Sequence, residues 1–301
     1  MKMMNSLLAP LALVAAACAP EEETAAPAVE TDAGSEFLRY VEEEEGGGAR
    51  LQTSIVRYKD ADGRLVDLIG VVHIGEQSYY EDLNALFTTY DALLYELVAP
   101  ESYRPTKDRS VGGLGLFQKG FGDLLRLTFQ LDHVDYQAEN FVHADVTPTR
   151  LSELMDERGE NLFSLVISAM LTSMKAQASI DPEEAQAQGV EMLLALLSTD
   201  GGRSLKKVLA RQFGDLERIA AGLGDSKMGE LLLTERNKAC IEVVEEQLDE
   251  GDRRLGVFYG AAHMPDLEQR LLRMGFERAS EAWMDAWVVP PRPREKAAEE
   301  F

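Results

Sequence analysis

Two of the chain's four histidines follow a glycine by three positions, and each comes directly after an apolar segment. The first motif, GVVH, ends at His73, and the second, GAAH, ends at His263. An imidazole can act as a base, an acid or a metal ligand near neutral pH. A glycine ahead of it lets the backbone approach a ligand closely. The repeated GxxH motif therefore predicts one site to which both histidines contribute.

Glu96 is the acidic candidate, because it lies in the apolar segment 92–98. A buried carboxylate needs a partner or a shifted pKa. Two imidazoles and a carboxylate can hold a divalent metal with one position open for water. Without a metal, a histidine and a glutamate can act as a base and the group that orients it. We expect His73, His263 and Glu96 to form the site in one of these two ways.

Three further polar residues are candidates for the same site. His143 and Asp145 alternate along the extended segment FVHAD, so both can point into one crevice, although Asp145 could instead cap the next helix. Arg236 lies in a polar, helical patch, where it could clamp a carboxylate or an oxyanion, or form an exposed ion pair. His133 has no expected role, and Cys240 is expected in the core.

The elements that must position these residues alternate between strand and helix. The pattern predicts a hairpin of 52–58 with 65–72, a helix over 77–89, a strand over 92–98, and a second strand–helix–strand unit over 253–289. Such units form parallel strands with right-handed crossovers, and ligands bind at the carboxyl ends of these strands. The predicted fold class is α/β, with a mixed, mainly parallel sheet from two βαβ-type halves and a large helical insertion over about 148–250.

The N-terminus predicts export. An apolar run over 7–17 is too short to span a membrane, and small residues precede Cys18, as in a signal peptide. The segment resembles a bacterial lipobox, which implies cleavage before Cys18 and attachment of a lipid to its thiol. A plain secretory signal is the alternative. Ala19 favours delivery to the outer membrane facing the periplasm, or to the cell surface.

The composition of the remaining chain distinguishes three segments. Residues 19–48 are rich in Ala, Pro, Glu, Thr and Gly and are expected to be a disordered tether. Residues 49–290 form the expected domain, and 291–301 a polar tail. The formal net charge of −23 argues against nucleic acid and against an anionic membrane surface as partners. Contact with the membrane is therefore expected only through the lipid, and the oligomeric state stays open.

Three stretches carry a resemblance to a known family: GVVHIG with the later YELV, LLTERNKAC, and YGAAHMPDLEQRLLRMGF. With them the chain resembles the TraB/PrgY/TIKI family over about 65–276, and more distantly the erythromycin esterase and ChaN-type proteins. The resemblance implies an α/β fold with a site built from His73, His263, Glu96 and Arg236. TIKI members are described as metal-dependent proteases that favour Mn or Co, and PrgY and TraB members are linked to inhibition of peptide pheromones.

The chain departs from the family at one point, because LVAPE follows the first strand's glutamate where ELxxxR is usual, and Arg104 is displaced. The expected function is a secreted or lipid-anchored hydrolase of a peptide or small-molecule substrate. A divalent metal (Mn, Co or Zn) would lie on His73, His263 and Glu96, with Arg236 stabilising charge and His143 as a further catalytic candidate. The alternatives are a non-catalytic lipoprotein that binds a peptide or haem-like ligand, and a metal-free esterase with His73 as base.

Overall fold

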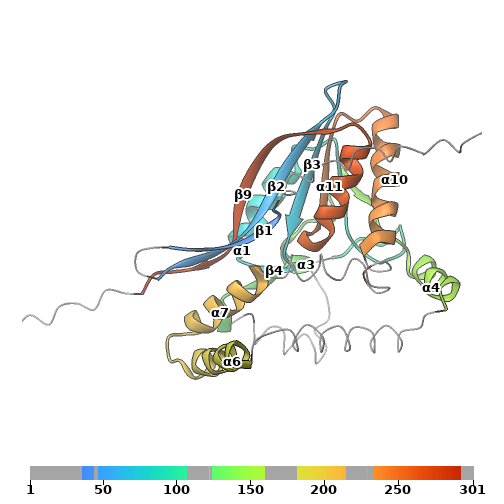
Figure 1. Cartoon of the computed structure of the whole chain (residues 1–301). Coiled ribbons are helices and arrows are strands. Elements are labelled where there is room, and N and C mark those ends of the chain that lie inside the picture. The colour runs from blue at the N-terminus through green and yellow to red at the C-terminus, as the bar shows by residue number, and fades with distance from the viewer. Residues whose placement is uncertain are drawn as a thin grey trace, which may run out of the picture. The chain divides into compact units, whose positions relative to one another are not determined.

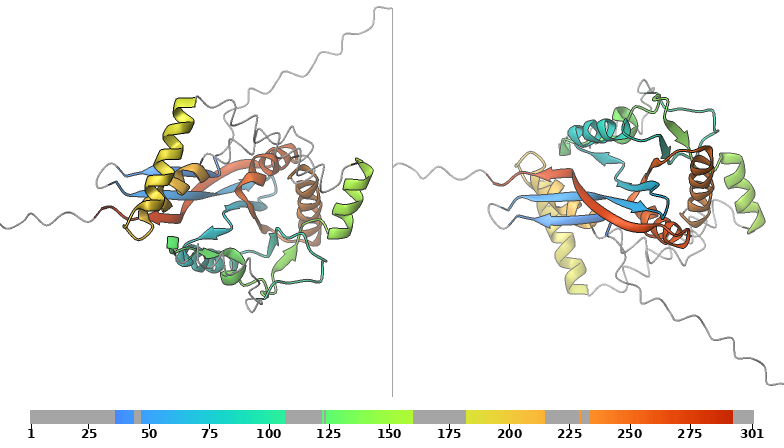
Figure 2. Two further views of the ribbon diagram at one scale, coloured as in Figure 1. Left: turned by 90° about the horizontal axis from the view of Figure 1, so that it is seen from below. Right: turned by 90° about the horizontal axis from the view of Figure 1, so that it is seen from above.

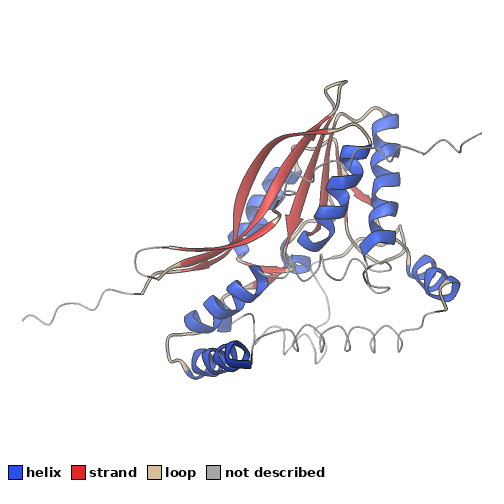
Figure 3. Ribbon diagram, viewed as in Figure 1, coloured by secondary structure: helices blue, strands red, loops and turns tan. Residues whose placement is uncertain are grey.

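The computed structural model of the chain describes residues 36–43, 47–106, 122, 124–159, 182–214, 229 and 233–292. The predicted signal peptide with Cys18 and the end of the predicted tail lie outside these residues. Within them, a seven-stranded sheet carries helices around it, and a separate two-stranded sheet lies beside it (Figures 1 and 3). None of the described helices is long and apolar enough to cross a membrane.

The strands are β1 (Leu38–Glu42), β2 (Ala49–Lys59), β3 (Leu65–Val71), β4 (Ile74–Gly75), β5 (Ala92–Tyr95), β6 (Thr128–Phe129), β7 (Phe141–His143), β8 (Arg254–Gly260) and β9 (Glu277–Val289). The helices are α1 (Gln77–Phe87), α3 (Gln130–His133), α4 (Pro148–Glu157), α6 (Pro182–Leu197), α7 (Arg203–Gly214), α10 (Glu235–Glu250), the 3-10 turn η2 (Ala261–His263) and α11 (Met264–Arg273).

The sheet is mixed, as predicted, and parallel pairing prevails where the candidate site lies. The strands β3, β8, β5 and β7 are parallel neighbours in that order. On the other side of β3, β2 pairs antiparallel with β1, β3 and β9. Because β8 lies between β3 and β5, the two strand–helix–strand units interleave. The carboxyl ends of four parallel strands consequently meet at one edge.

Burial explains why the central strands are almost wholly apolar. Every residue of β5, and every residue of β3 and β8 after the first, is buried. Parallel strands in the middle of an α/β sheet are covered on both faces, so they lose the alternation of an exposed strand. α10 packs against β5 and α11, whereas α1 lies beside α3 (Figure 2).

The prediction that residues 19–48 form a disordered tether is wrong for residues 38–42. Residues 38–42 form β1, which pairs with β2, and Phe37 and Leu38 are buried in the core. The physical reason is local, because the apolar side chains of FLRYV stand inside a segment whose average composition is polar and small. The domain therefore begins before Arg50.

In its described residues the predicted insertion forms the helices α4, α6, α7 and α10, with a loop at 198–202 between α6 and α7. Thr147 caps α4, with its Oγ1 accepting from the Arg150 N–H at 3.1 Å, and Pro148 follows at the first helical position. The insertion also contributes to the main body of the fold, because α7 packs against β1, β2 and β9.

Candidate active site

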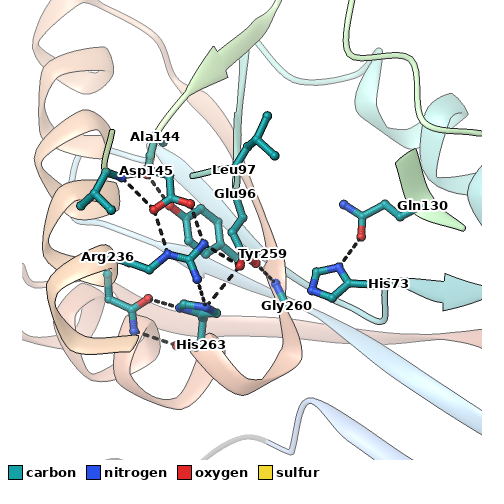
Figure 4. A network of polar contacts seen from close by, with 12 residues as sticks. His73, Glu96, Leu97, Gln130, Ala144, Asp145, Arg236, Tyr259, Gly260 and His263 are labelled. Carbon is teal, nitrogen blue, oxygen red and sulfur yellow. Dashed lines mark hydrogen bonds and ion pairs between the residues drawn. The ribbon is translucent and has the colours of Figure 1, made fainter. Parts of the chain in front are cut away.

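The candidate site lies where the parallel strands end. β3 and β8 run in register, with Val71 opposite Gly260, so the two GxxH turns leave the sheet side by side. β5 ends at Tyr95, one residue before Glu96. Figure 4 shows His73, Glu96 and His263 around this edge, with Arg236 and Asp145 behind Glu96. The structure thus brings together five of the residues that the sequence singled out.

A buried ion network forms the floor of the site. Arg236 enters from the first turn of α10 and makes two bonds to Asp145, from Nε to Oδ1 at 2.9 Å and from Nη2 to Oδ2 at 2.6 Å. Its Nη2 also donates to Glu96 Oε1 at 2.7 Å. The Asp145 side chain is fully buried, and those of Arg236 and Glu96 are each 12% exposed. Such a network is stable only while all three charges remain together.

The electrostatics of the network keep Glu96 ionised. Burial acts to raise the pKa of Glu96, but contact with His263 and the charge of Arg236 outweigh burial and hold the pKa well below its usual range. Burial likewise acts against the charge of Arg236, but its bonds to Asp145 and Glu96 raise its pKa further. The second oxygen of Glu96, Oε2, accepts the backbone N–H of Gly260 at 2.7 Å.

His263 is buried and held in one tautomer. The side-chain nitrogen of Asn237 donates to the His263 carbonyl and to Asp266, so its Oδ1 accepts from His263 Nδ1 at 2.7 Å. This leaves Nε2 directed at the ion network, 3.4 Å from Glu96 Oε1 and 3.5 Å from Arg236 Nη1. The ring also lies edge-on to Tyr259.

His73 has the same kind of partner but a different environment. Gln130 donates from Nε2 to Tyr136 Oη at 2.7 Å, so its Oε1 accepts from His73 Nδ1 at 2.9 Å. A side-chain amide therefore orients each imidazole, which is how ligand and catalytic histidines are commonly fixed. Unlike His263, His73 is exposed, and its Nε2 faces the space in front of Gly260.

The two motif glycines differ in how closely other groups approach them. A Cβ on Gly260 would lie 3.3 Å from Glu96 Oε2, 3.7 Å from His73 Nε2 and 3.8 Å from His263 Cδ2. The same point is therefore close to all three predicted side chains. A Cβ on Gly70 would instead meet the Phe37 carbonyl at 3.4 Å and Met264 at 3.5 Å. A Cβ at Gly70 would thus make only ordinary contacts, whereas a Cβ at Gly260 would press on Glu96 at the centre of the site.

The three side chains open into a cavity of about 360 Å³. His73, Glu96 and His263 give it a polar base, and its other walls are apolar. The apolar lining consists of Leu38, Val71, Val72, Ile74, Phe213, Ala261 and Ala262, with Gly260 beside them. A pocket of this size with few convergent polar groups is typical of a small-molecule or side-chain site.

The predicted metal ligands do not fit a metal in this arrangement. Both oxygens of Glu96 are engaged, by Arg236 and by the Gly260 N–H, and the guanidinium also stands 3.5 Å from His263 Nε2. A divalent cation between Glu96 and His263 would meet that positive charge at close range. Among the described residues, no group of three His, Cys, Asp or Glu is arranged to hold a metal ion.

Other predicted residues lie outside the cavity. His143 Nε2 contacts the Leu97 carbonyl at 2.7 Å, so it fixes the chain just after Glu96. Arg104 donates to the carbonyls of Ala138 and Phe141, both at 2.8 Å, rather than to Glu96. His133 stacks on Tyr80, as an incidental residue would. Burial raises the pKa of Cys240, which therefore stays a protonated core thiol, as expected.

Four residues of the site were not predicted from the sequence: the amides Asn237 and Gln130, and the cavity residues Leu38 and Phe213. Asn237 could have been recognised as a candidate from the sequence, because it directly follows Arg236 in the segment TERN. Nothing in the sequence indicated Gln130, since 57 positions separate it from His73. Phe213 and Leu38 come from the predicted insertion and tether, which were not expected to contribute to the site.

The comparison with family models and the comparison with curated proteins both find no match for the chain. The likeness to the TraB/PrgY/TIKI family therefore stays a prediction from the three stretches quoted above.

Proposed function

We propose that the chain is a hydrolase that cleaves an ester or amide bond next to an apolar group, with His73 as general base. One observation carries this proposal: two amide-oriented imidazoles and an ionised carboxylate surround Gly260 at the base of one largely apolar cavity. An acid and a base placed on the two sides of a carbonyl are the minimum that hydrolysis needs.

His73 suits the base because its Nδ1–H is committed to Gln130. The neutral ring then carries its lone pair on Nε2, which faces the cavity. There Nε2 takes a proton from a water molecule, and the water oxygen attacks the carbonyl carbon of the substrate. The exposure of His73 lets this proton leave to solvent after each turnover.

His263 suits the acid. Its Nδ1–H is committed to Asn237, so a second proton on Nε2 makes an imidazolium. The ionised Glu96, 3.4 Å from Nε2, favours that charge, whereas the Arg236 guanidinium, 3.5 Å from Nε2, opposes it. When the tetrahedral intermediate collapses, Nε2 gives its proton to the leaving oxygen or nitrogen, and it then takes a proton from the carboxylic acid product, so that the imidazolium is restored and the product leaves as a carboxylate. Arg236 holds Glu96 ionised and in place, and so acts as a positioning residue.

The developing oxyanion needs donors at the cavity wall. The η2 turn begins there, at Ala261, and runs directly into α11. The first N–H groups of a helical segment have no partner within it, and its dipole favours negative charge. We assign oxyanion stabilisation to the N–H groups of Ala261 and Ala262, in the manner of an oxyanion hole.

The proposal differs from the metal-dependent peptidase that the family resemblance implies, because the Arg236 guanidinium occupies the position beside Glu96 and His263. None of the catalytic steps proposed above uses a metal ion. The proposed substrates are peptides or small acyl compounds, and the apolar walls select an aliphatic or aromatic group next to the cleaved bond.

The test is hydrolysis of a panel of p-nitrophenyl acyl esters and of a peptide library by the full chain, with and without a chelator. We expect many turnovers per chain that persist with the chelator. His73→Ala should abolish them, and His133→Ala should serve as the matched control with unchanged activity. Turnover that requires restored Mn, Co or Zn would contradict the proposal. So would saturation at one ligand per chain without product, which would indicate a binding protein.

Export with a lipid on Cys18 belongs to the same proposal and rests on the sequence alone. It places the enzyme at the outer membrane facing the periplasm, or at the cell surface. Growth with a radioactive fatty acid should label the full chain but not Cys18→Ala. Label that persists in the variant would exclude this anchor.

A further inference from the structure

A second cavity, of about 810 Å³, lies apart from the candidate active site and carries a different chemistry. It is bounded by α6, α7, the end of β1 and the segment after β9. We call it the basic groove and define it by its lining residues: Glu42, Gly47, Glu191, Leu194, Ala195, Ser198, Arg203, Ser204, Lys207, Val208, Arg211 and Arg292. Four cations thus face two carboxylates, in a chain whose formal net charge is −23.

Three of the cations form a row along α7. Arg203, Lys207 and Arg211 are spaced by four positions, so they share one face of the helix. Two of them have a carboxylate partner, since Lys207 pairs with Glu42 and Arg211 with Glu191. Their charges are therefore largely neutralised within the groove.

The other two cations, Arg203 and Arg292, form no ion pair with a residue that the structure describes. Arg203 donates from Nε to the Pro290 carbonyl and from Nη2 to the Gly47 carbonyl, both at 2.7 Å. These acceptors are neutral, so they hold the guanidinium in place without cancelling its charge. Arg292 is exposed at the rim and forms no ion pair with any residue that the structure describes. Two guanidiniums outside any ion pair among the described residues are suited to an oxyanion, although the Asp200 carboxylate is near enough to Arg203 to offset part of its charge.

Two further observations bear on what the groove accepts. The Tyr40 hydroxyl is buried without a hydrogen-bond partner in the described part of the chain. It lies close enough to Glu42, Glu191 and Arg211 to feel their charges. Next to the cations, Leu194, Ala195 and Val208 form an apolar wall. Tyr40 is not among the lining residues, so the groove itself combines cations with apolar surface, in a volume well beyond that of a bare phosphate.

We propose that the basic groove binds an amphiphile with an oxyanion head group, such as a phosphate monoester with an alkyl chain. The head group lies on Arg203 and Arg292, and the alkyl part lies against Leu194 and Val208. The groove is separate from the hydrolytic cavity, although α7 contributes Phe213 to that cavity. Binding therefore requires neither His73 nor hydrolysis, and the proposal stands independently of the proposed enzyme activity.

The test is calorimetric titration of the full chain with dodecyl phosphate below its micelle concentration. One molecule should bind per chain, and His73→Ala should bind as the wild type does. Arg292→Gln should weaken binding by about tenfold, because it removes one charge-assisted contact, and Arg203→Gln with Arg292→Gln should weaken it further. Arg278→Gln is the matched control, since this exposed arginine pairs with Glu281 on β9, outside the groove.

Further arms test the sign of the head group and the source of the ligand. Dodecyltrimethylammonium should not displace dodecyl phosphate. Binding to phosphatidylglycerol vesicles that dodecyl phosphate competes away would identify a membrane lipid as the source, and binding of the monomer alone would identify a soluble ligand. No binding of dodecyl phosphate would overturn the proposal. Unchanged affinity in Arg292→Gln, which leaves the Arg203 contacts intact, or equal binding of the cationic detergent would do so too.

Discussion

The two GxxH turns share a motif, a place at a strand end and an amide partner, yet they differ in environment. His73 is exposed, and Gln130 holds its Nδ1. His263 is buried, held by Asn237, and 3.4 Å from the ionised Glu96. The glycines differ as well, because a Cβ at Gly70 would make only ordinary contacts with Phe37 and Met264, whereas a Cβ at Gly260 would press on Glu96.

The difference indicates that the GxxH motif sets the position of each histidine, whereas the residues around the histidine determine its proposed role. A solvent-open imidazole can exchange its proton readily, which suits a base. The buried imidazole of His263, 3.4 Å from the ionised Glu96, is the proposed acid. The predictions below test whether the two turns have these separate roles.

The largest expected effect is on catalysis at the exposed turn. His73→Ala should lower kcat by about 10²- to 10⁴-fold, because it removes the general base. Its melting temperature should stay close to that of the wild type, since the side chain is exposed. Steady-state kinetics and calorimetric melting measure both. Unchanged kcat, or a strongly lowered melting temperature, would remove the contrast between the turns.

The next effect is on stability at the buried turn. Arg236→Met should lower the free energy of unfolding by about 3–5 kcal/mol, because it leaves the buried carboxylates of Glu96 and Asp145 without their cation. Urea unfolding measures it, with Arg278→Gln as an exposed control expected within about 0.5 kcal/mol of wild type. A loss no larger than that of the control would show that the network does not support the fold.

A smaller loss of stability is expected for His263→Ala. The substitution leaves the buried Asn237 Oδ1 without its donor, which costs about 1–3 kcal/mol. The same urea experiment compares it with His73→Ala, for which almost no loss is expected. Equal losses for the two variants would mean that the burial difference has no energetic consequence.

The smallest effect is the dependence of stability on pH. The folded pKa of Glu96 is lowered, so its ionised form stabilises the fold above the unfolded pKa, about 4.3. This stabilisation is lost as the pH falls through the lower, folded pKa. The difference in unfolding free energy between wild type and Glu96→Gln should be constant from about pH 7 to 5 and shrink below about pH 4. If the difference in unfolding free energy persists unchanged to pH 3, Glu96 does not stabilise the fold through its ionised form.

Much of the site could be predicted because it depends on local pattern. The apolar runs that end in GVVH and GAAH have the length and composition of buried strands, and parallel strands place their carboxyl ends at one edge. This reasoning located His73, His263 and Glu96 correctly. Arg236 and Asp145 were candidates on the same basis, although nothing in the sequence indicated that they would pair with each other.

The rest depends on contacts between distant segments. No periodicity indicates that Gln130 reaches His73 or that Phe213 lines the cavity. The metal stays a prediction, and the Arg236 guanidinium that argues against it could not be foreseen, because a sequence gives the types of the ligands but not the position of a cation beside them. The tether boundary was misplaced because composition averages hide a five-residue strand.

The central claim is that His73 and His263 act on one reacting group in one cavity. Its most direct test is kcat for the wild type, His73→Ala, His263→Ala and the double variant, all confirmed as folded by circular dichroism and assayed with a chelator. Residues that act as a unit are strongly non-additive. The account predicts that the double variant is about as slow as the slower single variant. A double variant whose loss equals the product of the two single losses would contradict it.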